Sequence, residues 1–193
     1  ARPDHRRMGK ALAEVSEKLV HTMQFAEGAH VASCADCVSL PFREIPGERR
    51  RMVAEILERS PEPPRSANGE VDPVWFTAAS TRSVEILKQR ETHMRYEMQV
   101  FRVGDLAIVG LPGEPFVEGQ LAIKTSSPAP FTFPTHMVSH YVGYLPTREA
   151  YARGGHEANN EVTYWAKLAP GCLETVAERA VVNIKTLFPD RVA

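Results

Sequence analysis

The feature that most constrains the fold of this chain is the stretch from Met94 to Leu111. Apolar and polar side chains alternate from Met94 to Val103, which is the pattern of a strand with one buried face. Gly104-Asp105 follows as a turn, and residues 106–111 are apolar throughout. A strand, a two-residue turn and a second apolar strand predict an antiparallel hairpin.

Helical patterns surround this hairpin, because apolar residues recur there every three or four positions. They predict helices over residues 6–26, 48–59, 73–91 and 171–187. Asp4 and Asp72 stand where residues that cap helix starts are favoured. Gly28 and Pro189 stand where helices commonly stop.

Extended segments are expected at residues 29–45 and 131–145, in addition to the hairpin. Helices and strands therefore alternate along the chain, and the hairpin makes the sheet mixed rather than parallel. We expect an α/β fold with a mixed β-sheet and packed helices. The length of 193 residues suffices for a core, and we expect one segment over residues 1–193.

A candidate functional position lies where the hairpin ends, in Leu111-Pro112-Gly113-Glu114. Pro115 is expected in the first turn of a following helix, where a missing N–H costs nothing. Glu114 then lies between strand and helix, and a helix N-terminus favours its ionised form. The strand expected at 131–145 ends at Tyr144-Leu145. Loops after strands often carry the chemistry of α/β proteins.

Several other functions are disfavoured by the sequence. The net charge is −1, and the run Arg49-Arg50-Arg51 would point in three directions on a helix, so no nucleic-acid partner is implied. There is no run of eighteen apolar residues. Cys34 and Cys37 form a CxxC pair, but a zinc ribbon needs a second pair and a thioredoxin-type site needs a strand-to-helix turn.

His136 and His140 would share one face of a regular strand, since they are four positions apart. Two such histidines do sometimes bind zinc. No carboxylate or third histidine is spaced to join them. A supporting or structural role is therefore favoured for both.

The ordered motifs are similar to those of the neutral/alkaline non-lysosomal ceramidases. They are the strands around Gly104-Asp105-Leu106, then Pro112-Gly113-Glu114, then Tyr141-x-x-Tyr144-x-x-Thr147-x-Glu149-x-Tyr151. That family consists of zinc amidohydrolases that cut the amide of N-acylsphingosines. Its metal is held by two His, one Glu and one Tyr. The resemblance implies zinc as cofactor and Glu114 and Tyr144 as metal ligands.

The resemblance also implies partners. In the family, the two His ligands and the serine nucleophile precede the matched region, so we expect the C-terminal portion of a larger zinc-hydrolase domain. The expected partners are the N-terminal part of the same polypeptide and a ceramide-like lipid, with a peripheral membrane contact and no nucleic acid. A secreted or periplasmic location is what the family suggests.

One departure from the family pattern lies in Gly154-Gly155-His156-Glu157. The eukaryotic-like pattern places another tyrosine beside the metal at the position of His156. An imidazole can also donate to a carbonyl oxygen or bind zinc, so His156 is the candidate catalytic residue. The hypothesis is zinc-dependent hydrolysis of the N-acyl amide of ceramide-like lipids. The alternative is a non-catalytic chain of the same fold that binds a lipid or a partner.

Overall fold

The computed structural model describes residues 4–25, 27–158 and 161–191. The chain divides into two units, Ala1–His30 and Val31–Ala193. That the whole chain belongs to one catalytic domain stays a prediction.

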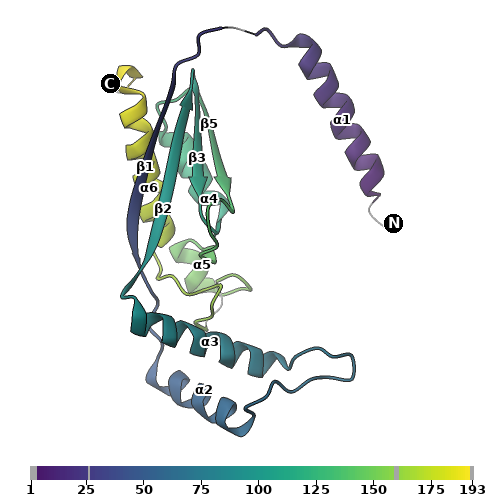
Figure 1. Ribbon diagram of the computed structural model, residues 1–193, viewed down its shortest axis with the longest axis vertical. Coiled ribbons are helices and arrows are strands. Elements are labelled where there is room, and N and C mark those ends of the chain that lie inside the picture. Colours follow the sequence, from purple (N-terminus) through teal and green to yellow (C-terminus); the bar gives the residue numbers. More distant parts are fainter. Residues whose placement is uncertain (1–3, 26, 159–160, 192–193) are drawn as a thin grey trace. The chain divides into compact units, whose positions relative to one another are not determined.

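The first unit contains one amphipathic helix, α1 (His5–Thr22) (Figure 1). The Asp4 side chain accepts hydrogen bonds from the N–H groups of Arg6 and Arg7, which confirms the predicted cap. The helix ends at Thr22, before the predicted end at residue 26, which lies outside the described residues. Its apolar stripe is exposed at each of these positions: Met8, Leu12, Val15, Leu19 and Met23.

The second unit is built on a four-stranded sheet in the order β1-β2-β3-β5 (Figure 1). The strands are β1 (Val31–Pro41), β2 (His93–Val103), β3 (Leu106–Leu111) and β5 (Phe131–His136). β2 pairs antiparallel with both β1 and β3, whereas β5 runs parallel to β3. The sheet is therefore mixed, and the predicted hairpin is present.

The core lies on one face of this sheet, against the helices α4 (Val117–Ser126) and α6 (Cys172–Leu187). The alternation read from the sequence explains this burial, because every second side chain of β2 points to the same face. Fully buried residues of the strands and of α6 include Leu40, Tyr96, Met98, Val100, Val109, Val176, Ala180 and Ile184. On the other face, Phe101, Phe131 and Phe133 remain largely exposed.

Most of the remaining elements lie at one end of the sheet, whereas the 3₁₀ turn over residues 189–191 lies at the other end, where Arg191 pairs with Asp105 of the β2–β3 turn. The helices α2 (Gly47–Arg59) and α3 (Pro73–Arg90) pack together, and Asp72 caps α3 through the N–H of Trp75. The short elements are β4 (Glu114–Pro115), β6 (Tyr144–Leu145), α5 (Arg148–Arg153) and the 3₁₀ turn η1 (Pro189–Arg191). Pro115 is thus in β4, and α4 begins two residues later than the sequence predicted.

The prediction of one strand over residues 131–145 is wrong. β5 ends at His136, and a loop over residues 137–143 separates it from β6. Met137 and Ser139 have φ angles of 58° and 62°, a left-handed conformation that a strand excludes. His136 and His140 therefore do not share the face of a regular strand.

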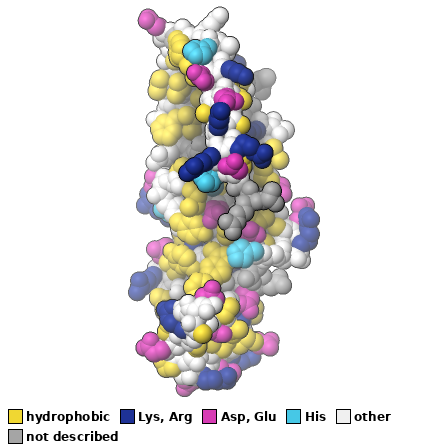
Figure 2. Space-filling view, turned by 90° about the vertical axis from the view of Figure 1, so that its right-hand side faces the viewer, with side chains coloured by type: hydrophobic (Ala, Val, Ile, Leu, Met, Phe, Trp, Pro, Cys, Tyr) yellow, Lys and Arg dark blue, Asp and Glu magenta, His cyan; other side chains and the backbone are white. Residues whose placement is uncertain are grey.

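Charged side chains are mixed on the face drawn in Figure 2, where acidic and basic groups alternate with hydrophobic ones. This distribution agrees with the net charge of −1 and shows no extended basic area there. None of the helices formed by the described residues has the length and apolar character needed to cross a bilayer.

Tyr96 offers a test of how the core holds the turn before Glu114. Its side chain is fully buried, and its hydroxyl donates to the carbonyl of Pro112 at 3.0 Å. We expect Tyr96→Phe to lower the free energy of unfolding by about 1–3 kcal/mol, because a buried carbonyl loses its partner. Urea denaturation measures this. Tyr164→Phe, at a 46% exposed residue, is the control and should change stability by less than about 0.5 kcal/mol.

Candidate functional site

Two short strands bring Glu114 and Tyr144 together. β4 and β6 pair in parallel, with Glu114 directly opposite Tyr144. The N–H of Glu114 donates to the carbonyl of Gly143 at 2.9 Å, and the N–H of Phe116 donates to that of Leu145 at 3.1 Å. Two residues that are far apart in the sequence are thereby held in register by backbone hydrogen bonds.

This pairing depends on two glycines. Gly113 and Gly143 have φ angles of +72° and +92°, which residues with a side chain rarely adopt. A Cβ atom on Gly143 would lie 2.6 Å from the carbonyl oxygen of Trp165, and one on Gly113 would collide with the carbonyl oxygen of Gly143. The backbones of β4, β6 and residue 165 can approach this closely only because both positions lack a side chain.

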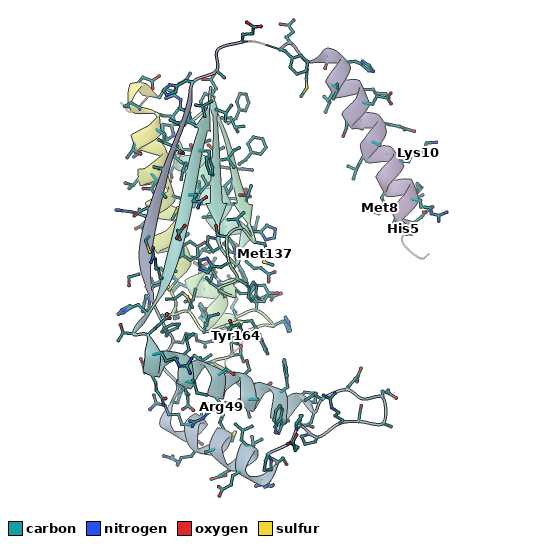
Figure 3. The ribbon with its side chains drawn as sticks, in the orientation of Figure 1. His5, Met8, Lys10, Arg49, Met137 and Tyr164 are labelled. Atoms are coloured by element: carbon teal, nitrogen blue, oxygen red, sulfur yellow. The ribbon has the colours of Figure 1, made fainter. Side chains whose placement is uncertain are left out.

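A supporting segment, residues 161–169, lies behind β6. The carbonyl of Trp165 accepts the N–H of Tyr144 at 2.8 Å. Tyr164 lies between the end of the sheet and α3, and its N–H donates to Ser80 of α3 at 2.8 Å (Figure 3). Arg49 of α2, also labelled in Figure 3, pairs with Glu161 at 2.6 Å. The helices α2 and α3 thus hold the segment on which Tyr144 rests.

The side chains form a cluster of carboxylates and tyrosines. The hydroxyl of Tyr141 donates to Oε1 of Glu114 at 3.2 Å. Burial, followed by the contact with Glu114, raises the pKa of Tyr141 to about 12. Burial and then the charges of Glu114 and Glu157 raise the pKa of Tyr144, and its own hydrogen bond with Glu114 adds to this. Both hydroxyls therefore keep their protons near neutral pH, and a cation bound among them would oppose this effect.

A pocket of about 390 Å³ opens beside this cluster. Its lining is part apolar and part polar: Leu111, Glu114, Pro115, Phe116, Val117, Gln120, Pro134, His136, Tyr144 and Glu157. An apolar wall with a few convergent polar groups is typical of a small-molecule site.

The structure brings together two of the three residues singled out in the sequence. Glu114 and Tyr144 line the pocket, and their role as ligands stays a prediction. His156 is exposed, and among the described residues it is Glu157, its neighbour, that lines the pocket. Gly154 and Gly155 do adopt positive φ angles, of 78° and 133°, as a tight turn requires. The catalytic role of His156 also stays a prediction.

The other participants carried little signal in the sequence. Tyr141 belongs to the Tyr-x-x-Tyr motif, but nothing local indicated its contact with Glu114. His136 joins the pocket, whereas His140 lies in another one with Glu91, Met94, Arg95 and Glu97. Only the tertiary fold, which brings distant segments together, could identify these neighbours.

The donor atoms fit a divalent metal as part of a site. Glu114 offers a carboxylate and Tyr144 a hydroxyl, which are oxygen ligands that zinc accepts. No group of three His, Cys, Asp or Glu side chains within the described ranges is arranged to hold an ion. Since catalytic zinc sites use three protein ligands or more, this pair would have to be completed by residues from elsewhere.

The supporting segment contains a buried cation, Lys167. It is 1% exposed, and its Nζ donates to the carbonyls of Val142 at 2.6 Å and of Tyr164 at 2.7 Å. The ammonium also lies 4.2 Å from the centre of the Tyr164 ring. Burial lowers the pKa of Lys167 to about 8.

Comparison with known proteins returned ceramidases. No protein-family model matches the chain, and no curated protein does. Among solved structures, a neutral ceramidase from Pseudomonas aeruginosa is similar at 15% identity and a TM-score of 0.47, over 85% of this chain. A ceramidase complexed with C2 is similar at 22% identity and a TM-score of 0.43, over 51% of this chain.

The two solved proteins are much longer than the region matched. The match covers 29% of the Pseudomonas aeruginosa chain and 15% of the other. Both are ceramidases, as the resemblance of the sequence led us to expect. Because both TM-scores lie below 0.5, a proposal for function has to rest on the geometry of the site.

Gly143 provides a test of the close backbone approach. We expect Gly143→Ala to lower the free energy of unfolding by about 1–3 kcal/mol, since the new methyl group would meet a carbonyl in a strained conformation. Gly47→Ala is the control, because its Cβ would lie 4.0 Å from the nearest atom. Urea titrations measure the free energy of unfolding of both variants. Equal values for Gly143→Ala and Gly47→Ala would contradict the close approach.

Lys167 predicts a pH dependence of stability. Its pKa is about 8 in the fold against 10.5 ordinarily, so between these values the unfolded chain holds the proton more tightly. The free energy of unfolding should therefore rise with pH in this window. Lys167→Met should remove about 1–3 kcal/mol of that rise, measured by urea titrations at pH 7 to 10. The exposed Lys124→Met is the control, and an unchanged slope in Lys167→Met would refute the argument.

Proposed function

We propose that this chain is part of a zinc-dependent amidohydrolase that cleaves the N-acyl amide of ceramide-like lipids to a sphingoid base and a fatty acid. The observation that carries the proposal is the pairing of Glu114 with Tyr144 in register across β4 and β6. This pair corresponds to the Glu and Tyr ligands that the sequence resemblance implied. Both residues line a pocket, which supports a role in binding and chemistry.

In this proposal Glu114 and Tyr144 hold the metal. The carboxylate contributes a hard anionic oxygen, and the phenol is kept in place by a strand that leaves it little freedom. Bound zinc supplies a Lewis acid and can bring the pKa of a water molecule near 7. Tyr141 orients the Glu114 carboxylate through its hydrogen bond.

The other side chains would act on the substrate. We assign His156 the role of donating a proton or a hydrogen bond to the amide carbonyl oxygen, for which its exposure leaves it available. The apolar part of the pocket, with Leu111, Phe116, Val117 and Pro134, suits a hydrocarbon chain. The polar part, near Glu157 and Gln120, suits an amide or hydroxyl group.

The remaining parts would come from the N-terminal part of the same polypeptide. The pair in this chain supplies two ligands, so the two histidines and the serine nucleophile of the family have to lie there. A lipid substrate also favours a peripheral contact with a membrane, from which such a molecule would enter. Both partners are proposals that follow from the zinc site.

The alternative is a chain of the same fold that binds a lipid or a partner without catalysis. The observation that favours it is that the described residues hold no cluster of three His, Cys, Asp or Glu for a metal. The pocket would serve this function equally well. Dependence of activity on zinc separates the two proposals.

We expect the full-length polypeptide to release fatty acid from N-acylsphingosine, to lose this activity with a zinc chelator and to regain it with added zinc. Glu114→Gln and Tyr144→Phe should each lower kcat/KM by roughly 100-fold or more, and lower the zinc content, because each removes a ligand. Glu118→Gln, an exposed glutamate on α4, is the matched control and should retain activity. Activity that is indifferent to chelation would refute the zinc proposal, and absence of hydrolysis together with lipid binding would support the alternative.

A further inference from the structure

Lys167 is an unusual residue to find at the back of this site. Its side chain is 1% exposed, and its contacts within the described part of the chain are two carbonyls and one aromatic ring. Buried ammonium groups normally pair with a carboxylate, because the loss of water is costly. Among the described residues no carboxylate pairs with Lys167 to offset that cost, so a packed hydrophobic side chain would serve stability at least as well.

The two carbonyls show what the ammonium connects. One belongs to Tyr164, in the supporting segment that contains Lys167 itself. The other belongs to Val142, in the 137–143 loop, at 2.6 Å. Hydrogen bonds from a charged donor are shorter and stronger than neutral ones. The ammonium therefore connects the 137–143 loop, at a residue just before Tyr144, to the supporting segment.

The position of Val142 affects both members of the Glu114–Tyr144 pair. Its side chain lies against Gly113, so close that a Cβ atom there would approach Val142 Cγ2 to 2.7 Å. The next residue, Gly143, accepts the N–H of Glu114 through its carbonyl. The residue after that is Tyr144 itself. A displacement of Val142 would thus be transmitted to Glu114 and to Tyr144 together.

The other end of this connection is fixed. The carbonyl of Lys167 accepts the N–H of Arg43, just beyond β1, at 2.8 Å. The carbonyl of Leu168 accepts the hydroxyl of Tyr151 at 2.7 Å. The N–H of Ala169 donates to the carbonyl of Pro41 at 2.9 Å. The backbone of Lys167 and its neighbours is therefore fixed to the end of β1, and from there the side chain extends to the loop.

We propose that Lys167 is a positioning residue that sets the geometry of the Glu114–Tyr144 pair by holding the Val142 carbonyl. The residue does not touch the pair, and acts on it through the backbone of residues 142–144. Its importance for catalysis rests on the proposed function, but the positioning itself can be measured without any activity.

The test compares Lys167→Met with the wild type in the full-length polypeptide by hydrogen–deuterium exchange and mass spectrometry. The variant keeps an unbranched side chain that is one atom shorter, and removes its donors. We expect amides in peptides covering residues 112–117 and 142–146 to exchange at least ten times faster. Peptides covering residues 96–101 of β2 should exchange no faster than in the wild type, because local opening does not require global unfolding. The exposed Lys124→Met is the matched control and should change neither region.

Two results would overturn the proposal. Equal acceleration in all three regions would mean that Lys167 contributes only to global stability. No acceleration at residues 112–117 and 142–146 would mean that the pair does not depend on it. Should Lys167→Met fail to fold, Lys167→Leu takes its place, since it also removes every donor of the side chain. It should then accelerate the two site regions selectively, and uniform acceleration or none would again overturn the proposal.

Activity of the same proteins separates this proposal from the proposed function. Chelator-sensitive hydrolysis without selective exchange in Lys167→Met would leave the function standing and remove the positioning role. Selective exchange in Lys167→Met without zinc-dependent hydrolysis would support the positioning role and refute the proposed function. If both proposals hold, Lys167→Met should lower kcat at least tenfold, and the exposed control should not.

Discussion

The close approach of two backbones at Gly113 and Gly143 is the constraint on which the rest of the site depends. Both residues adopt positive φ angles, and each faces a neighbouring carbonyl at a distance that excludes a side chain. This approach allows β4 and β6 to pair, and the pairing in turn sets Glu114 opposite Tyr144. The backbone geometry of the two strands thus places Glu114 and Tyr144, the two candidate ligands, opposite each other.

Neighbouring parts of the structure fix the positions of β4 and β6 through hydrogen bonds. The buried Tyr96 hydroxyl holds the carbonyl of Pro112, and the carbonyl of Gly113 accepts the N–H of Met137. On the other side, Trp165 and Lys167 hold residues 142–144. The core of the sheet and the supporting segment therefore meet at the site. Sites that are built on such fixed elements keep their geometry better than sites on free loops.

The electrostatics of the site favour a cation. Burial is the largest cause of the raised pKa of Tyr144 and of Tyr141, and the charges of Glu114 and Glu157 raise the first further, while Glu114 raises the second. Negative charge is thus concentrated where the two hydroxyls point. A divalent ion would satisfy the carboxylate and lower the cost of ionising a phenol. This is the physical link between the observed cluster and the proposed zinc site.

The sequence by itself determined those parts of the molecule that depend on local periodicity. The alternation from Met94 to Val103 predicted the central hairpin, and Asp4 and Asp72 predicted two helix starts, since these signals act within a few residues. Tertiary structure decided the rest. Residues 131–145 are broken by a left-handed turn at Met137 whose N–H is held by Gly113, a contact that no local pattern encodes. Nothing in the local sequence marks Lys167 as buried or Glu157 as part of the pocket. Only the folding of distant segments onto one another buried the first and brought the second to Tyr144.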